Sequence, residues 1–200
     1  MREYHNERCK ECKNTIYRLL SRIDGGVKQA YDLGMPTHLD SYRGVSCFAS
    51  LESIYDALRG YRGYNSFVRA SGLSKVDYYL PAYQLVVEFD ESQHFTGPKF
   101  ISLNHYPSDL LLGYDRHKWV ELSHRLNKKD NDPPYRDEQR AWYDTLRDFS
   151  SVLLGNRPTV RLYAGDKRWC SMDAYKAENV AFFQALLCLG EETVSSYSWA

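Results

Sequence analysis

The chain lacks a long hydrophobic run. Its longest nearly apolar stretch, residues 181–189, contains Gln184 and falls far short of the roughly 20 residues that a membrane span requires. The N-terminal segment MREYHNERCKECK is polar and has no apolar core of the kind found in secretory signals. These absences predict a cytoplasmic protein with no membrane association.

An excess of charge of one sign is also missing, because 26 Lys and Arg residues balance 26 Asp and Glu residues. No whole-molecule field draws such a protein towards polyanions, so contact with nucleic acid requires local basic patches. Three basic groups are candidates, although their charges could equally solvate helix faces or pair with acids. They comprise Arg59, Arg62, Arg69 and Lys75; Arg116, Lys118, Arg125, Lys128 and Lys129; and Arg157, Arg161, Lys167 and Arg168.

The chain also lacks an even number of cysteines, which complete pairing in disulfides would require. The chain has 5 cysteines, which suits a reducing compartment better than a disulfide framework. Cys9 and Cys12 form a C-x2-C pair preceded by His5, which by spacing is half of a Zn²⁺ site. Without a second pair, the two are either part of a structural zinc site or incidental free thiols. The further ligands that folding could bring near are Cys47, Cys170 and His38.

The length of 200 residues fits one domain, and 43% apolar residues supply its core. Apolar spacing and turn residues predict a mixed α/β sheet flanked by helices. Residues 1–46 are expected to form an N-terminal helical extension and residues 47–200 the main domain. Helices are expected over residues 14–23, 51–59 (with Ser50 as N-cap and Gly60 at the end), 109–126, 137–149 and 173–189. Strands are expected over residues 66–69, 76–80, 84–90 and 159–163.

The most informative segment is an acidic hairpin around the turn 81–83. If Leu80 pairs with Leu85, the same register places Asp77 opposite Glu88. Like charges directly opposed in an antiparallel pair are destabilising, so something must compensate them. Period-two alternation also puts Asp90 on the face of Glu88, which predicts three converging carboxylates.

A hard divalent cation would relieve this repulsion, and Mg²⁺ (or Mn²⁺) favours a few carboxylates together with water. Such an ion could polarise a phosphodiester and lower the pKa of the attacking water. His94, four residues after Asp90, is positioned to assist as a general acid or base. The alternative is a solvated acidic face with His94 as a surface or hydrogen-bonded residue.

The spacing from Asp77 through Glu88 and Asp90 to His94 resembles the PD-(D/E)XK nuclease superfamily. It is most similar to the branch related to very short patch repair endonucleases. An acid on the preceding helix, Glu52 in SLESIYDALRG, and the later segments DEQRAWYDTL and TVRLY also match this branch. The resemblance covers residues 51–163 and implies a restriction-endonuclease-like fold and metal-dependent DNA cleavage.

By this resemblance, Asp77 and Glu88 are metal ligands and His94 assists hydrolysis. Asp90 is expected as a third or water-bridged ligand, with Glu52 and Gln93 in support. The sequence departs from the superfamily where a lysine usually follows the second acid by two residues, because Asp90 stands there. The residues that could supply the missing cation are His94, Gln93, Lys99 and Arg140, the last of which could instead form an internal ion pair.

The predicted function is therefore Mg²⁺-dependent hydrolysis of DNA phosphodiester bonds. One alternative is a catalytically inactive module of the same fold that binds nucleic acid or a protein partner. Another is a protein-interaction domain organised by a zinc knuckle at Cys9 and Cys12. DNA is the expected partner. RNA as substrate, endonuclease or exonuclease action, and monomer or homodimer all remain open.

Overall fold

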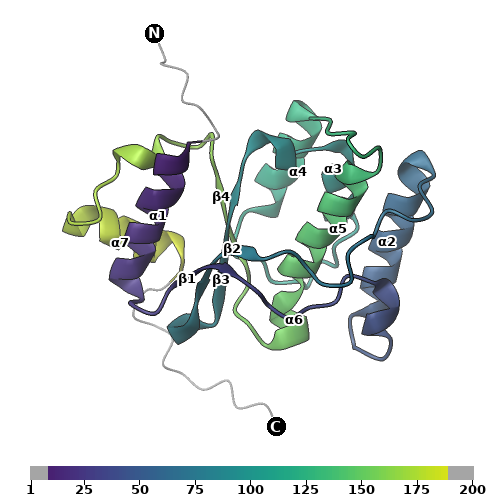
Figure 1. The fold of residues 1–200 in the computed structure, drawn as a ribbon, viewed down its shortest axis with the longest axis horizontal. Coiled ribbons are helices and arrows are strands. Elements are labelled where there is room, and N and C mark those ends of the chain that lie inside the picture. The colour runs from purple at the N-terminus through teal and green to yellow at the C-terminus, as the bar shows by residue number, and fades with distance from the viewer. Residues whose placement is uncertain (1–8, 189–200) are drawn as a thin grey trace.

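One four-stranded sheet organises the structure, a computed structural model that describes residues 9–188. Helices cover both of its faces (Figure 1). The strands are β1 (Lys28–Tyr31), β2 (Val76–Leu80), β3 (Leu85–Asp90) and β4 (Val160–Tyr163). The α-helices are α1 (Lys10–Ile23), α2 (Phe48–Arg62), α3 (Gly97–Asn104), α4 (Arg116–Leu126), α5 (Arg136–Asp148), α6 (Ser150–Leu154) and α7 (Ala177–Leu186). Short 3-10 turns are η1 (Leu39–Tyr42), η2 (Pro81–Tyr83), η3 (Ser92–His94) and η4 (Trp169–Ser171).

The sheet is mixed, with the strand order β1-β2-β3-β4. β1 and β2 pair antiparallel, β2 and β3 form an antiparallel hairpin, and β4 runs parallel to β3. In the hairpin, Tyr78 faces Val87 and Leu80 faces Leu85, which confirms the predicted register. Gln84 closes the turn in the left-handed region, with φ 48°. The α/β class and the mixed sheet are as predicted.

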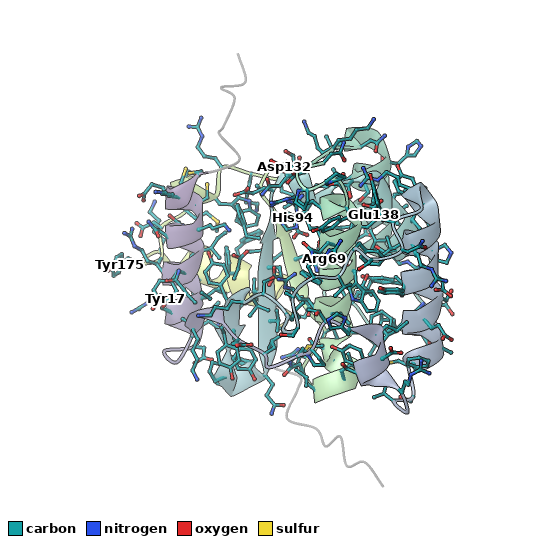
Figure 2. The ribbon with its side chains drawn as sticks, turned by 45° about the vertical axis from the view of Figure 1, so that its right-hand side comes forward. Tyr17, Arg69, His94, Asp132, Glu138 and Tyr175 are labelled. Atoms are coloured by element: carbon teal, nitrogen blue, oxygen red, sulfur yellow. The ribbon has the colours of Figure 1, made fainter. Side chains whose placement is uncertain are left out.

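The two faces of the sheet bury different clusters. On one face, Tyr78, Val87 and Phe89 pack against α1 and α7. On the other side, a larger apolar core joins α2 to α5 and includes Leu51 and Trp142. Figure 2 shows Tyr17 and Tyr175 on the α1 side and His94 and Glu138 on the side of α5. The polar residues of β3 thus lie between the sheet and α5.

Several predicted elements are wrong in type or extent. Residues 66–69 form no strand, although Phe67 and Val68 are buried as strand residues would be. The helix expected from residue 109 begins at Arg116, because Asp115 caps it by accepting the N–H groups of His117 and Lys118. α2 is longer than predicted: it begins after Cys47 and ends at Gly63, which adopts the left-handed conformation (φ 75°).

Residues up to 46 do not form a separate helical extension in the described part of the chain. β1 belongs to the sheet, and α1 packs on it. The strand was missed because it is an edge strand whose residues are mostly exposed, so no alternating pattern marks it. None of the helices among residues 9–188 has the length and apolar character needed to span a bilayer.

Candidate functional site

Asp77 and Glu88 meet at the end of the hairpin, as the register requires. The backbone N–H of Asp77 donates to Glu88 Oε1 at 3.2 Å, and the N–H of Phe89 donates to Asp77 Oδ2 at 2.9 Å. The ammonium group of Lys13, from α1, lies 3.1 Å from Asp77 Oδ1. The like charges predicted to face each other are thus partly compensated by a lysine that precedes Asp77 by 64 residues.

Glu88 is buried, and burial raises the pKa of its carboxyl group to about 7. The guanidinium of Arg147, whose Nε lies 3.5 Å from Glu88 Oε1, lowers this pKa, while the charge of Asp77 raises it. Near neutral pH, Glu88 is therefore poised between its protonated and ionised forms. A cation bound between Asp77 and Glu88 would favour the ionised form.

Asp90 lies on the same face as Glu88 but is held by other partners. Arg161 Nη1 donates to both of its oxygens, at 2.9 and 3.2 Å, and Trp119 Nε1 donates to Oδ2 at 2.8 Å. Its side chain is fully buried. These contacts make Asp90 an ion-pair partner of Arg161, and the expectation that it is a third or water-bridged metal ligand stays a prediction.

His94 lies where the chain leaves β3, with its side chain one-fifth exposed. Its Nδ1 lies 3.4 Å from Asp144 Oδ2 and 3.5 Å from Asp90 Oδ1. Burial alone would lower the pKa of His94, but the hydrogen bond and charge of Asp144 outweigh burial and raise it. The imidazole is therefore oriented through Nδ1, and Nε2 is the nitrogen available for proton transfer.

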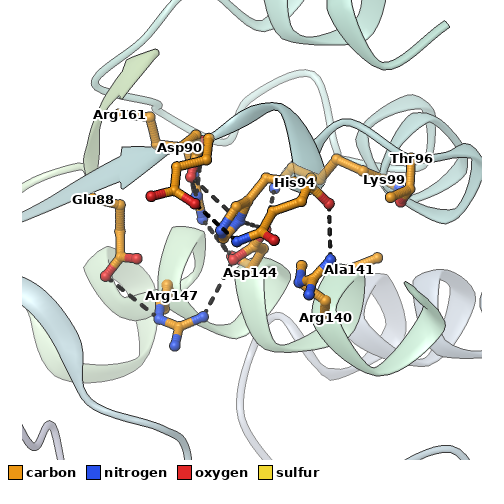
Figure 3. Close-up of polar contacts among 12 residues, drawn as sticks. Glu88, Asp90, His94, Thr96, Lys99, Arg140, Ala141, Asp144, Arg147 and Arg161 are labelled. Atoms are coloured by element: carbon orange, nitrogen blue, oxygen red, sulfur yellow. Dashed lines mark hydrogen bonds and ion pairs between the residues drawn. The ribbon is translucent and has the colours of Figure 1, made fainter. Parts of the chain in front are cut away.

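A buried charge network surrounds these residues (Figure 3). Arg161 Nε donates to Asp148 Oδ1 at 2.8 Å, and Lys99 Nζ lies 3.5 Å from Asp144 and 3.7 Å from Asp148. Lys99 is 1% exposed, and its Nζ has no hydrogen bond within the described structure. The neighbouring cations hold the pKa of Asp144 well below its ordinary value, despite burial that would raise it. The network locks α3, α5 and β4 to β3.

The remaining residues predicted for the site lie elsewhere or have other partners. Gln93 donates to Glu91 Oε2 at 3.0 Å, and its carbonyl accepts from Arg140. Arg140 forms an ion pair with Asp130 at 2.8 Å. An internal ion pair was one of the two roles predicted for it. Glu52 is exposed on α2, which packs against α3 and α5 on the side away from the sheet (Figure 1). The structure therefore does not bring Glu52 to the hairpin carboxylates.

A basic pocket of about 270 Å³ lies beside the start of α3. Its lining includes Arg62, Lys128 and Lys129, which come from two of the predicted basic groups. The N–H of Lys128 donates to the carbonyl of Phe95 at 2.9 Å, so the loop after α4 lies beside the residue that follows η3. Arg62 is already paired with Glu138, whereas Lys128 and Lys129 form no ion pair within residues 9–188.

Three cysteines lie closer together than the predicted carboxylate ligands do. Cys9, Cys12 and Cys170 place their sulfur atoms within 4.8 Å of one another. Across the described residues, this is the only group of three or more Cys, His, Asp or Glu side chains that approach so closely. Asp77, Glu88 and Asp90 therefore do not form such a group. His5 lies outside the described residues, and Cys47 and His38 are not part of the cluster.

Several residues of the site could not be identified from the sequence. Four of them lie on helices that are far from the hairpin along the chain, so the sequence does not indicate that they contact it. These residues are Lys13, Arg147, Asp144 and Asp148. Asp144 falls within the segment DEQRAWYDTL that carries the resemblance, which was the one available signal. Comparison with protein-family models, with characterised proteins and with solved structures finds no match for this chain.

Proposed function

We propose that this chain is a metal-dependent nuclease that hydrolyses DNA phosphodiester bonds at the β2–β3 hairpin. The observation that carries the proposal is the apposition of Asp77 and Glu88, with the pKa of Glu88 raised to about 7. The mixed sheet with helices on both faces is compatible with the restriction-endonuclease-like fold that the motif spacing suggests. Asp77 and Glu88 would hold the ion without help from Asp90.

The donor set fits Mg²⁺ or Mn²⁺. Both are hard ions that take carboxylate oxygens, and Mg²⁺ is commonly bound through one or two carboxylates while it keeps several waters. When bound, the ion would polarise the phosphodiester and lower the pKa of a water molecule. The lysine that is missing from the motif has a spatial substitute in Lys13, whose ammonium lies 3.1 Å from Asp77.

The other polar residues have separate roles in the proposed reaction. Lys13 supplies positive charge beside Asp77, where charge develops on the phosphate during attack. The Nδ1 of His94 faces the carboxylates of Asp144 and Asp90 and donates to them, so Nε2 is the nitrogen that would take up and release a second proton. Lys128 and Lys129 line the pocket beside the start of α3, and they would contact phosphates of the DNA backbone.

Cleavage of supercoiled plasmid and of single-stranded DNA tests the proposal. Wild-type protein, Asp77→Ala and Glu88→Gln are compared in Mg²⁺, in Mn²⁺ and without divalent metal, with exposed Glu52→Gln as the matched control. We expect metal-dependent cleavage by wild type and Glu52→Gln and loss of at least about 100-fold in the two hairpin variants. Equal cleavage by all four proteins would refute the assignment.

A second candidate is a nuclease-fold module that binds nucleic acid or a partner without turnover. It is favoured by the ion pair of Asp77 with Lys13 and by the burial of Asp90 with Arg161, which leave the described structure without a three-carboxylate cluster. This candidate predicts DNA binding that needs no metal and is unchanged in Glu88→Gln. Metal-dependent cleavage by the wild type would eliminate it.

A further inference from the structure

Three thiols from opposite ends of the described chain converge on the α1 side of the sheet. Cys9 is the N-cap of α1, Cys12 lies in its first turn, and Cys170 lies in η4. None of the three forms a disulfide bond within residues 9–188. Cys12 is buried, whereas Cys9 and Cys170 are partly exposed, the latter on the wall of a pocket of about 270 Å³. An ion could therefore reach the cluster from solvent.

The backbone on both sides of the cluster is firmly held. Trp169, next to Cys170, is buried, donates through Nε1 to the carbonyl of Tyr163 at 2.9 Å and packs edge-on against Phe89. On the other side, α1 buries Ile16 and Leu19 against the same face of the sheet. The approach of the three sulfur atoms thus follows from core packing and does not depend on a loose loop.

The environment of Cys9 favours the thiolate. Its Sγ accepts the backbone N–H of Cys12 at 3.2 Å, at the positive end of the α1 dipole. Burial tends to raise the pKa of Cys9, but hydrogen bonds from Cys12 and Cys170 lower it below the ordinary value. Burial and the bond to Cys9 raise the pKa of Cys12 to about 12. The metal-free cluster therefore keeps protons that a bound cation would displace.

We propose that Cys9, Cys12 and Cys170 bind one Zn²⁺ ion in a structural site that fastens the start of α1 to η4. Sulfur atoms bound 2.3 Å from a tetrahedral Zn²⁺ lie about 3.8 Å apart, so sulfurs already within 4.8 Å need only a small contraction. Soft thiolates select Zn²⁺ over Mg²⁺. The fourth ligand comes from water or from a donor outside this trio. The proposal is independent of the nuclease activity.

The site has a consequence for the hairpin. Lys13 directly follows Cys12, its carbonyl accepts from the hydroxyl of Tyr78 at 2.9 Å, and its ammonium contacts Asp77. An ion that fixes the first turn of α1 also fixes Lys13 against β2. Loss of the ion would therefore loosen Lys13 from Asp77 while leaving the carboxylates of the hairpin in place.

Zinc content of the purified full chain is the first test. Protein purified without chelator is analysed by elemental mass spectrometry as wild type, Cys170→Ser and Cys47→Ser, the last being a matched control from the N-cap of α2. We expect one zinc per chain in wild type and Cys47→Ser and a large loss in Cys170→Ser. Zinc well below one per chain in the wild type would overturn the proposal, as would equal zinc in all three proteins.

A second measurement does not depend on a variant that folds. Thiols of native wild-type protein are titrated with a thiol-reactive dye before and after addition of a strong chelator. We expect Cys9 and Cys170, two of the 5 thiols, to become reactive only after chelation, because Cys12 is buried in the metal-free structure. Unchanged reactivity would contradict zinc binding. A mass two hydrogens lower, which signals a disulfide within the trio, would replace the zinc site with a redox pair.

Discussion

Arg161 balances the charge of the buried network, because its guanidinium contacts Asp90 at 2.9 Å and Asp148 at 2.8 Å, and its Nη2 lies 3.6 Å from Asp144. Its pKa is raised well above the ordinary value by these carboxylates, despite burial that would lower it. A buried cation of this kind contributes to the stability of the fold by neutralising the carboxylates that it contacts. Its removal leaves uncompensated carboxylates in the core.

Arg161→Met should therefore be strongly destabilising, by about 3–5 kcal/mol in the free energy of unfolding. The matched control is Arg59→Met, because Arg59 pairs with Asp56 on the exposed surface of α2 and should lose less than about 0.5 kcal/mol. Urea unfolding measures both values. A loss for Arg161→Met no larger than that of the control would show that the network does not stabilise the fold.

The raised pKa of Glu88 predicts that the free energy of unfolding depends on pH. Because its pKa rises from 4.5 to about 7 on folding, the native state binds more protons than the unfolded state between these values. The contribution of Glu88 to stability is therefore present below pH 4.5 and is lost as the pH rises through 7. Glu88→Gln should lack this loss, which is on the order of 3 kcal/mol.

Urea unfolding at a series of pH values without divalent metal measures this effect as the difference between Glu88→Gln and the wild type. Titrating groups that do not interact with Glu88 are common to both proteins and cancel in the difference. Glu52→Gln should show no such difference, since Glu52 is exposed. Parallel pH profiles for the wild type and Glu88→Gln would contradict a raised pKa at Glu88.

At the scale of elements, the hairpin was predictable and much of its surroundings was not. Counting along the strands was enough to place Asp77 opposite Glu88, because an antiparallel register is set locally by its turn. The partners of the acids come from α1, α5 and β4, and only tertiary packing brings these elements to β3. The aromatic and β-branched residues of 66–69 predict a strand, but Phe67 and Val68 are buried in irregular backbone instead.

Lys13 connects α1 to the hairpin, so its substitution should change both metal binding and cleavage. Lys13→Met removes a cation that competes with a divalent ion for Asp77, so the affinity for Mn²⁺ should rise several-fold. Cleavage should fall in the same variant, because the positive charge beside the phosphate is lost. Stability should change by less than about 1 kcal/mol, since the pair is partly exposed.

Calorimetric titration and plasmid cleavage, both performed on Lys13→Met, separate the two effects. The control is Lys10→Met, one helical turn earlier on α1 and exposed. An unchanged Mn²⁺ affinity in Lys13→Met would mean that Asp77 is not a ligand. A raised affinity with unchanged cleavage would remove Lys13 from the chemistry and keep the metal site.

At the scale of the whole molecule, zero formal charge means that DNA binding depends on one local surface. Lys128 and Lys129 are the candidates, because they line the pocket beside the start of α3 and form no ion pair with any residue from 9 to 188. The double variant Lys128→Ala/Lys129→Ala should weaken DNA binding for all sequences alike. The slope of log affinity against log salt should fall by about 2.

Fluorescence anisotropy over a range of salt concentrations measures that slope. Arg18→Ala/Arg22→Ala, on α1 across the sheet, serves as the control for the loss of two positive charges. An equal loss of affinity in both double variants would indicate a diffuse electrostatic effect. No loss in the Lys128 and Lys129 variant would place the DNA elsewhere on the molecule.

Calorimetric titration of Mn²⁺ into wild type, Glu88→Gln and Glu52→Gln measures whether Asp77 and Glu88 together bind a divalent cation. We predict one oxygen-ligated site in wild type and Glu52→Gln, with affinity that rises as the pH passes 7 and Glu88 ionises. Glu88→Gln should bind no Mn²⁺ at this site. Identical isotherms for all three proteins, or no binding by the wild type, would show that Asp77 and Glu88 do not form a cation site.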